Sequence, residues 1–323
     1  MRRHIFLIVI ATGSLLSVSA QQKDTVVINK KVITLSEIII RNKVDVPSFI
    51  ERIKNDTTFY KAFRNLRVLQ FTSLNDIRMQ DKKGKVKGSL LSRTRQWAQK
   101  GCRHTVVEEE QVTGDIYDRQ GNYNYYTPEL YASLFFAPDT VCGETNIVKG
   151  MDIDVKGKSG MNKRKEQLKM LFFNPGKAIP GLPLIGNKVA IFDEDMAGLY
   201  NYDLDQDEYL DDLCYVFTIT AKTDEEGGNR NKIVIDRMTT WFSVKTLEVL
   251  ARHYSMSYHA GLFDFDVDMQ VEMTHSGGYL VPRLLRYTGD WDVVLKKEKE
   301  EYLPPHCSIS VIEIIAVLFH SLM

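Results

Sequence analysis

A row of carboxylates at every second position is the first feature of this chain that could do chemistry. The stretch "DFDVDMQVEM", residues 264–273, contains Asp264, Asp266 and Asp268. Carboxylates bind calcium and magnesium, so a metal site is one interpretation. On a strand, however, alternate residues of one face lie ~6.8 Å apart, too far for one ion with bonds of about 2.5 Å. We expect these carboxylates to face water. The other face would then be apolar, with Phe263, Phe265, Val267, Met269, Val271 and Met273.

A second acidic stretch resembles a calcium-binding loop but lacks two of its essential residues. In "DLDQDEYLDD", residues 203–212, three aspartates occupy the first, third and fifth loop positions. The sixth position requires glycine for a sharp turn and the twelfth requires glutamate. Here they are Glu208 and Cys214. The pattern therefore favours an acidic turn that leads into a strand at Cys214.

Catalytic and nucleotide-binding signatures are missing from the sequence. It has no GxSxG, HExxH or SxxK motif, and no GxGxxG or GxxxxGK[ST] phosphate loop. Seven histidines are scattered, and we expect His253 and His259 to be structural. We therefore predict no catalytic residue, no metal and no cofactor, and an enzyme such as a hydrolase is the least favoured alternative. Basic and acidic residues number 42 each, which does not favour nucleic-acid binding.

The N-terminus has the pattern of an export signal. Arg2 and Arg3 precede an apolar stretch from Ile5 to about Leu16, and small residues end at Ala20. This order is typical of a cleaved signal peptide, and the apolar run is short for a membrane span of ~20 residues. No cysteine follows the cleavage point, so a lipid-modified N-terminus is not indicated. We predict a signal peptide at 1–20 and an exported protein, periplasmic or associated with the outer membrane.

Four cysteines are too far apart in sequence for a zinc-binding motif. An exported protein can form disulfides, and the spacing leaves their pairing open. A bond between Cys102 and Cys142 is one alternative. Cys214 lies in the apolar strand pattern "LCYVFTIT" and is expected to be a buried thiol, and no partner is assigned to Cys307.

The remaining pattern predicts one large domain with additions at both ends. Residues 21–46 form an extended arm rich in β-branched residues, which could add an edge strand. A single domain is expected at 47–300, with a helix and loop insert at about 139–210. An apolar tail at 301–323, broken by Glu313, is atypical and fits either a final helix over the sheet or an aberrant end in a place where a strand would be expected.

Within the domain, the hydrophobic period changes from helix to strand. Residues 47–66 have helical spacing and one aromatic face, with Asp56 as the expected N-cap of their second part. From residue 67 the period is two, which predicts a hairpin with a basic turn at 81–85. The segment "TPELYASLFF", residues 127–136, fits a short helix or an apolar loop. A helix is expected at 161–176, then an apolar loop, and an antiparallel meander from 212 to 297.

The meander is rich in methionine and aromatic residues, and alternation alone leaves two interpretations. These side chains could form an ordinary core under helices. They could also line a cavity between the sheet and its helices, since methionine adapts to variable apolar ligands.

The order of these elements resembles the LolA/LolB-type lipoprotein carriers. The likeness spans about 47–297 and depends on "TTWFSVKTLEVLARHYSM", "FDFDVDMQVEMT" and "GGYLVPRLLRYTGDWDV". Trp241, Lys245 and Thr246 fit one family pattern, and Gly278 with Pro282 fits another. The segments "FYKAFRNLR" and "TPELYASLFF" are also similar to exported proteins of Gram-negative envelopes. The greater length, the insert and the tail differ from the family.

The resemblance implies an α+β fold: a large curved antiparallel sheet, an incomplete barrel, with helices on its concave face. It also implies a non-enzymatic protein that binds a lipid, an acyl chain or a lipoprotein. The alternative function is an interaction module of an outer-membrane assembly, in which the arm at 21–46 pairs with a partner's edge strand. The residues expected to line the apolar site are Tyr60, Phe63, Phe172, Phe173, Trp241, Phe263, Phe265 and Met269.

Overall fold

The computed structural model describes residues 24–28, 31–81, 83–148, 170–182, 184–259, 263–293 and 310–319. Side chains are not described at 37, 38, 126, 263, 291–293 and 310–319. The predicted signal peptide and part of the predicted insert therefore lie outside the described residues, as does Cys307.

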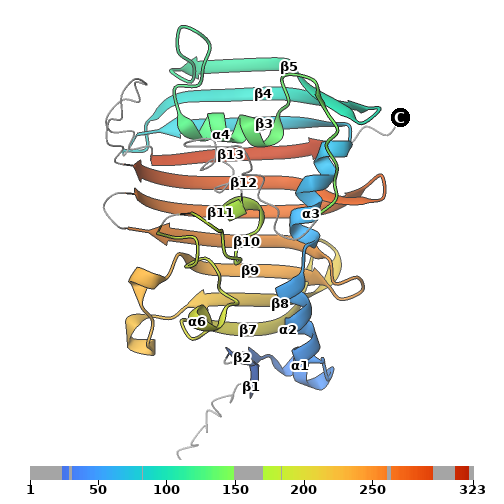
Figure 1. Cartoon of the computed structure of the whole chain (residues 1–323), viewed down its shortest axis with the longest axis vertical. Helices are drawn as coiled ribbons and strands as arrows, with labels where there is room; N and C mark the ends of the chain where they lie inside the picture. Colours follow the sequence, from blue (N-terminus) through green and yellow to red (C-terminus); the bar gives the residue numbers. More distant parts are fainter. Residues whose placement is uncertain are drawn as a thin grey trace, which may run out of the picture.

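One 13-stranded sheet dominates the molecule (Figure 1). Its order is β1-β2-β7-β8-β9-β10-β11-β12-β13-β3-β4-β5-β6, and all neighbours are antiparallel except β2 and β7. The strands are β1 Asp24–Ile28, β2 Lys31–Leu35, β3 Phe71–Gln80, β4 Val86–Gln99, β5 Cys102–Gly114, β6 Val141–Cys142, β7 Tyr200–Tyr209, β8 Asp212–Ala221, β9 Ile235–Ser243, β10 Val249–Tyr258, β11 Phe263–Ser276, β12 Tyr279–Val293 and β13 Ser310–Phe319.

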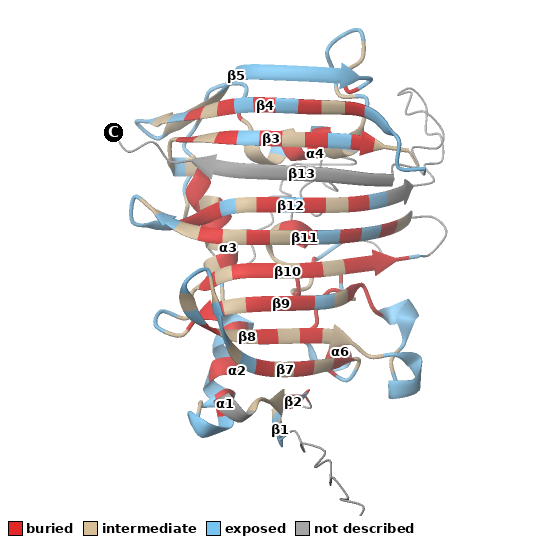
Figure 2. Ribbon diagram, turned by 180° about the vertical axis from the view of Figure 1, so that it is seen from behind, coloured by how far each residue is buried: buried red, intermediate tan, exposed pale blue. Residues whose placement is uncertain are grey.

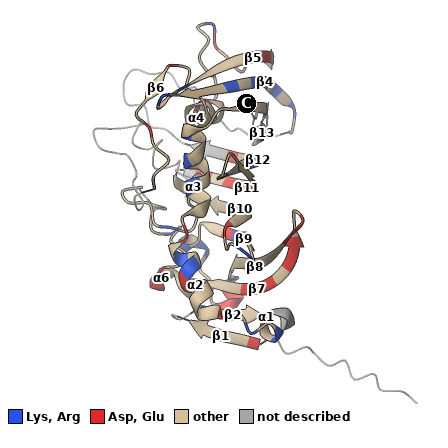
Figure 3. Cartoon of the chain, turned by 90° about the vertical axis from the view of Figure 1, so that its right-hand side faces the viewer, with Lys and Arg blue, Asp and Glu red and all other residues tan. Residues whose placement is uncertain are grey.

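The longer helices gather on one face of this sheet, as the side view shows (Figure 3). The main helices are α2 Val46–Asn55, α3 Thr58–Asn65 and α4 Tyr126–Phe135, and the shorter ones are α1 Glu37–Arg41, α6 Glu194–Ala197, η1 Leu66–Val68, η2 Asp224–Glu226 and η3 Arg230–Lys232. Residues 170–173 are also helical. The α+β fold with a large curved sheet and helices on its concave face is therefore confirmed.

Strand alternation explains which side chains meet the helices. Along β11, Phe265 and Met269 are 1% and 2% exposed, whereas Asp266 and Asp268 are exposed. Burial alternates in the same way along β3 and β4 (Figure 2). Pro282 in β12 lies at an irregularity of the β11–β12 register, where a residue without an N–H is tolerated. The core is thus formed by the side chains that point from each strand toward the helices.

The α2–α3 pair confirms the aromatic helices expected at 47–66. Phe49, Ile50 and Ile53 of α2 are buried, and so are Phe59 and Phe63 of α3. The N-cap is one residue later than expected, at Thr57. Asp56 still serves the first turn, because its Oδ1 accepts the Thr58 N–H at 3.1 Å.

Two expectations about acidic and terminal segments differ from the structure. The stretch at 203–209 belongs to the strand β7 rather than to a turn, and the alternate residues Tyr202 and Leu204 of this strand are buried against the core. Only Leu210 and Asp211 form the turn. Residues 310–319 of the tail form β13, an interior strand between β12 and β3. The sequence left open a final helix or an aberrant end, and the structure has a regular strand instead.

The cysteines behave in two ways. Cys102 of β5 and Cys142 of β6 form a disulfide, so this alternative is the one that the structure contains. Cys214 is a free thiol and fully buried, as expected from its strand.

A candidate apolar ligand site under helix α4

A small cavity of about 30 Å³ lies between α4 and the centre of the sheet. One wall is α4, another is the helical turn at 170–173, and the floor is made by β11 and β12. Its lining residues are Thr127, Leu130, Tyr131, Leu134, Phe135, Phe172, Phe173, Met269, Leu285 and Tyr287. None of these side chains is charged, so the cavity favours an apolar occupant.

Local sequence explains how α4 presents its wall. Leu130 and Leu134 are four residues apart, as are Tyr131 and Phe135, and such pairs lie on the same side of a helix. On the floor, Met269 is paired with Tyr287 across β11 and β12. Gly289 makes room for this tyrosine, because a Cβ at Gly289 would lie 2.2 Å from the Tyr287 hydroxyl. A side chain there would therefore displace part of the cavity floor.

Aromatic rings join the covering segments to one another. The Phe173 ring lies 4.3 Å from the ring of Phe63 in α3 and 6.0 Å from that of Phe135 in α4. Phe172 meets Tyr287 edge-on at 5.6 Å. Such ring pairs stabilise by roughly 0.5–1.5 kcal/mol beyond their burial. The cover is thus several helices held together by side-chain packing.

One polar contact attaches α4 to the sheet. The buried Tyr131 hydroxyl donates to Asn75 Oδ1 at 2.6 Å. Asn75 in turn donates to Ser92 Oγ at 3.2 Å, and Ser73 and Thr94 hydroxyls are 2.6 Å apart. Burial raises the pKa of Tyr131 well above its usual range, so it stays a hydrogen-bond donor. A small satisfied polar network therefore lies beside the apolar cavity.

The β10 side of the site contains a buried tyrosine and a buried arginine. The Tyr254 hydroxyl lies 2.7 Å from both the Phe172 carbonyl oxygen and Met269 Sδ. Arg252, two residues away on the same face, is 6% exposed, and its Nε donates to Thr240 Oγ1 at 3.0 Å. Burial lowers the pKa of Arg252 to about 10, so it remains charged at neutral pH.

The predicted site residues divide between this cavity and its surroundings. Phe172, Phe173 and Met269 line it. Phe63 is buried against Phe173, and Phe265 is buried on the same strand face as Met269. Tyr60 packs on the core from α3 without lining the cavity, and the side chain of Phe263 lies outside the described residues.

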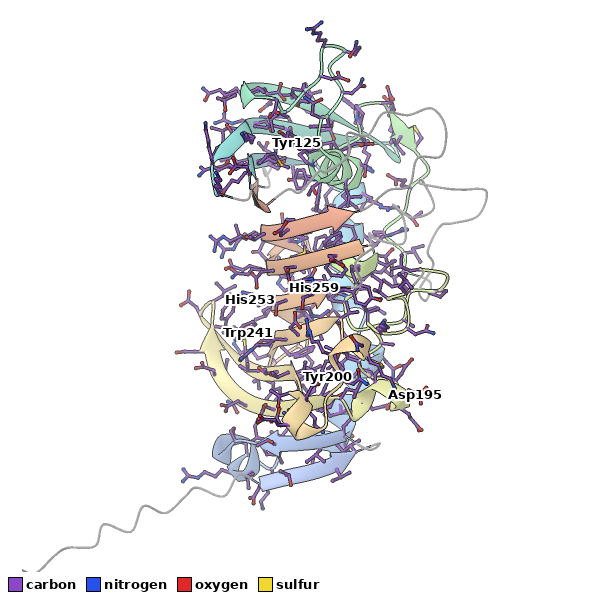
Figure 4. All side chains as sticks on the ribbon, turned by 90° about the vertical axis from the view of Figure 1, so that its left-hand side faces the viewer. Tyr125, Asp195, Tyr200, Trp241, His253 and His259 are labelled. Atoms are coloured by element: carbon purple, nitrogen blue, oxygen red, sulfur yellow. A yellow bond between two sulfur atoms is a disulfide. The ribbon has the colours of Figure 1, made fainter. Side chains whose placement is uncertain are left out.

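Trp241 lies on the opposite face of the sheet, which corrects its placement among the predicted lining residues. Its ring stacks on Tyr209 at 4.6 Å and meets His253 at 4.8 Å. Figure 4 shows Trp241 and His253 on the side of the curled β7–β8 hairpin, away from the helices. The reason is alternation, because the helix-facing residues of β9 include Thr240 and Phe242 on either side of Trp241.

The α4 residues and the β12 residues Leu285 and Tyr287 were missing from the sequence-based set. A signal for α4 existed in the spacing of Leu130, Tyr131, Leu134 and Phe135. For β12, the alternation of Leu285 and Tyr287 places them on one face. What no pattern shows is that these two segments meet around one space.

The acidic row of β11 faces solvent, as its alternation predicted. Nε2 of the exposed His259 lies 3.2 Å from Asp266 Oδ1. Among the residues that the structure describes, no group of three or more His, Cys, Asp or Glu side chains could hold a metal ion. The helices in the described part of the chain are all too short or too polar to cross a membrane.

Comparison with known proteins gives only distant structural matches. No family model matches the chain, and no curated protein matches its sequence. A putative outer membrane lipoprotein-sorting protein domain from Vibrio parahaemolyticus is 9% identical, with 80% of this chain and 88% of that chain covered and a TM-score of 0.24. A LolA superfamily protein from Nitrosomonas europaea is 9% identical (83% and 93% covered, TM-score 0.22).

A DUF1329 family protein from Desulfovibrio piger is 12% identical, with 82% and 95% of the two chains covered and a TM-score of 0.22. The chain is thus similar to LolA-superfamily and lipoprotein-sorting structures, which is the resemblance expected from its sequence. Matches at these scores carry no argument about what the chain binds.

Proposed function

We propose that this chain is a non-enzymatic envelope protein that binds an apolar ligand, either a lipid or the acyl chain of a lipidated partner. The observation that carries the proposal is the uncharged cavity between α4 and the β11–β12 floor. Its walls come from separate helical segments packed through aromatic rings rather than from one rigid element. Such a cover can separate from the sheet without breaking strand pairing.

The size of the cavity indicates how binding would proceed. A volume of about 30 Å³ is small beside the roughly 300–1,000 Å³ typical of ligand sites. A whole acyl chain therefore requires α4 to move outward from β11 and β12. The hydrogen bond from Tyr131 to Asn75 is a polar contact that such a movement would break. Ligand binding and release of α4 are thus expected to be coupled.

A fluorescent fatty-acyl probe tests the proposal directly. Leu134→Trp places a larger side chain in the cavity wall and should weaken probe binding by about tenfold or more, because it occupies the ligand's space. Leu91→Trp is the matched control, since Leu91 is 50% exposed on the outer side of β4. Native mass spectrometry of gently extracted protein should also show bound lipid. Protein that is repeatedly empty and binds no acyl probe would refute the proposal.

The compartment is part of the same proposal. The signal-like N-terminus supports export, and the Cys102–Cys142 disulfide supports an oxidising compartment such as the periplasm. Fractionation of cells that produce the full chain should recover it in the periplasm or with the outer membrane. Recovery of reduced, unprocessed protein from the cytoplasm of its natural host would contradict it.

A second candidate function, protein–protein interaction, is favoured by the edge strand β5. It pairs with β6 only at Cys102 and Arg103, and Val106 and Val107 are 43% and 52% exposed. Exposed apolar edges accept an added strand from a partner. The predicted arm forms the opposite edge of the sheet, where β1 pairs with β2 and β2 pairs with the chain's own β7. A pull-down from envelope extract tests this function. It is supported if the protein captures a partner, if Val107→Lys abolishes the capture, and if deletion of 24–35 leaves the capture intact.

A further inference from the structure

Two buried or half-buried cations lie where α2 joins α3, beside the apolar site. Arg252 of β10 has its guanidinium carbon 4.3 Å from the centre of the Phe59 ring. The half-buried Lys177 donates from Nζ to the Asp56 carbonyl oxygen at 3.1 Å. The charge of Arg252 is close enough to lower the pKa of Lys177, although burial is the larger cause. A buried cation is costly unless an anion accompanies it.

The nearby carboxylate does not balance both cations. Asp56 is the acidic group whose charge acts on Arg252 and on Lys177. Its Oδ1 already accepts from the Thr58 N–H at 3.1 Å and the Thr58 hydroxyl at 2.8 Å. In the described part of the chain, the Nε bond to Thr240 is the hydrogen bond found for Arg252, which leaves its Nη donors for a ligand.

Packed side chains connect the cation pair to the wall of the cavity. Tyr254 lies two residues from Arg252 and touches Met269 and Phe172, which line the cavity. From the other side, Phe59 lies 5.4 Å from Phe63, and Phe63 lies 4.3 Å from Phe173. An occupant could therefore place its apolar part at the cavity and its polar part at Arg252.

We propose that Arg252 and Lys177 bind the anionic head of an amphiphile whose acyl chain occupies the α4 cavity. This inference rests on the proposed function and adds the ligand class: an acyl chain that ends in a carboxylate or a phosphate. A guanidinium binds both groups through paired N–H donors, and the ammonium adds a point charge. The buried location strengthens that attraction. The anionic head would add a second negative charge to that of Asp56, the one described carboxylate whose charge acts on both cations.

Three probes with the same oleoyl chain separate head from tail. They are oleate, oleoyl lysophosphatidic acid and neutral monooleoylglycerol, each titrated below its micelle concentration. The unmodified protein should bind at least one of the two anionic probes about tenfold more tightly than the neutral probe. Oleate against lysophosphatidic acid then tells a carboxylate from a phosphate source.

Arg252→Gln should remove the preference by weakening the binding of the anionic probes toward that of monooleoylglycerol. Lys177→Gln should also reduce the preference for the anionic probes. Because Lys177 is only half-buried, this variant provides the test if Arg252→Gln does not fold. Arg286→Gln is the matched control, because Arg286 is an exposed cation that contacts Gln270. Equal binding of all three probes overturns this inference alone. Failure to bind any probe overturns the proposed function with it.

Discussion

At the scale of single residues, His253 is the side chain whose environment makes a clear titration prediction. Its Nε2 is buried and has no hydrogen-bond partner among the residues that the structure describes, and its ring lies against Trp241 and Tyr209. Burial lowers the pKa of His253 below 6.5. The charge of Arg286 lowers this pKa further, whereas the charges of Asp268 and Glu272 raise it and partly offset the effect of burial. The unfolded chain then binds this proton more tightly, so the His253 contribution to stability falls as the pH drops below about 6.5.

An NMR titration of the imidazole should give a pKa below 6.5 for His253. The exposed His275 provides an internal comparison, since it lies on the surface beside Glu248. His253→Gln should also make the melting temperature less sensitive to acid between about pH 7 and pH 5. A measured pKa at or above 6.5 would contradict the described burial.

Much of the residue-level pattern could be predicted from the sequence. The alternation of 264–273 separated Phe265 and Met269 from the aspartates, and the structure confirms it. The placement of Trp241 in the apolar site was wrong. It was based on the aromatic side chain alone, without regard to its position between the two helix-facing residues Thr240 and Phe242. Arg252 was not singled out at all. Its burial depends on Phe59, which lies 193 positions earlier and meets it only through the packing of α3 on β10.

At the scale of elements, the β7–β8 turn carries residues that do not suit its backbone. Leu210 and Asp211 have φ of 52° and 61° between the paired residues Tyr209 and Asp212. A two-residue turn with both φ values positive favours asparagine followed by glycine. Leu210→Asn with Asp211→Gly should therefore raise the free energy of unfolding by roughly 0.5–1 kcal/mol. Urea denaturation measures it, with Leu213→Asn, an exposed strand position, as the comparison.

The disulfide should matter through the short element that it holds. It joins β6 to β5 across 40 residues, and Glu144 just beyond it pairs with Arg103 Nε at 2.6 Å. Loop-closure entropy predicts a loss of roughly 3–4 kcal/mol when both cysteines become alanine. Urea denaturation should give a similar loss in the free energy of unfolding for this variant and for the unmodified protein under reducing conditions, each relative to the oxidised protein. An unchanged midpoint for both would show that β6 adds nothing to the stability.

Elements themselves were predictable where their period was regular, and less so where tertiary pairing decided. The α2–α3 helices and the β3–β4 hairpin follow from local spacing. The segment 203–209 looked like a turn because of its charge, yet it belongs to β7, a strand that buries Tyr202 and Leu204. Its strand state depends on β2 and β8, which pair with it from both sides.

At the scale of the whole molecule, the last strand in sequence joins the two halves of the sheet. The strands β3 to β6 form one antiparallel group and β7 to β12 another. Between them lies β13, which pairs with β12 over Leu284–Tyr287 and with β3 over Thr72–Gln80. In Figure 1, β13 lies between the first hairpin and the meander. Local sequence could not predict this, because its partners are far away in the chain.

This position predicts a large effect of a small truncation. Ending the chain at residue 309 removes β13 and leaves the backbone groups of β12 and β3 without their strand partner. Exposed interior edges of this kind promote association between chains. We expect the truncated protein to aggregate or to lose its single cooperative urea transition, as followed by size-exclusion chromatography and circular dichroism. Removal of 320–323 alone is the matched control, since it leaves β13 complete. A monomeric, cooperatively unfolding protein that ends at 309 would show that the two groups of strands do not depend on β13.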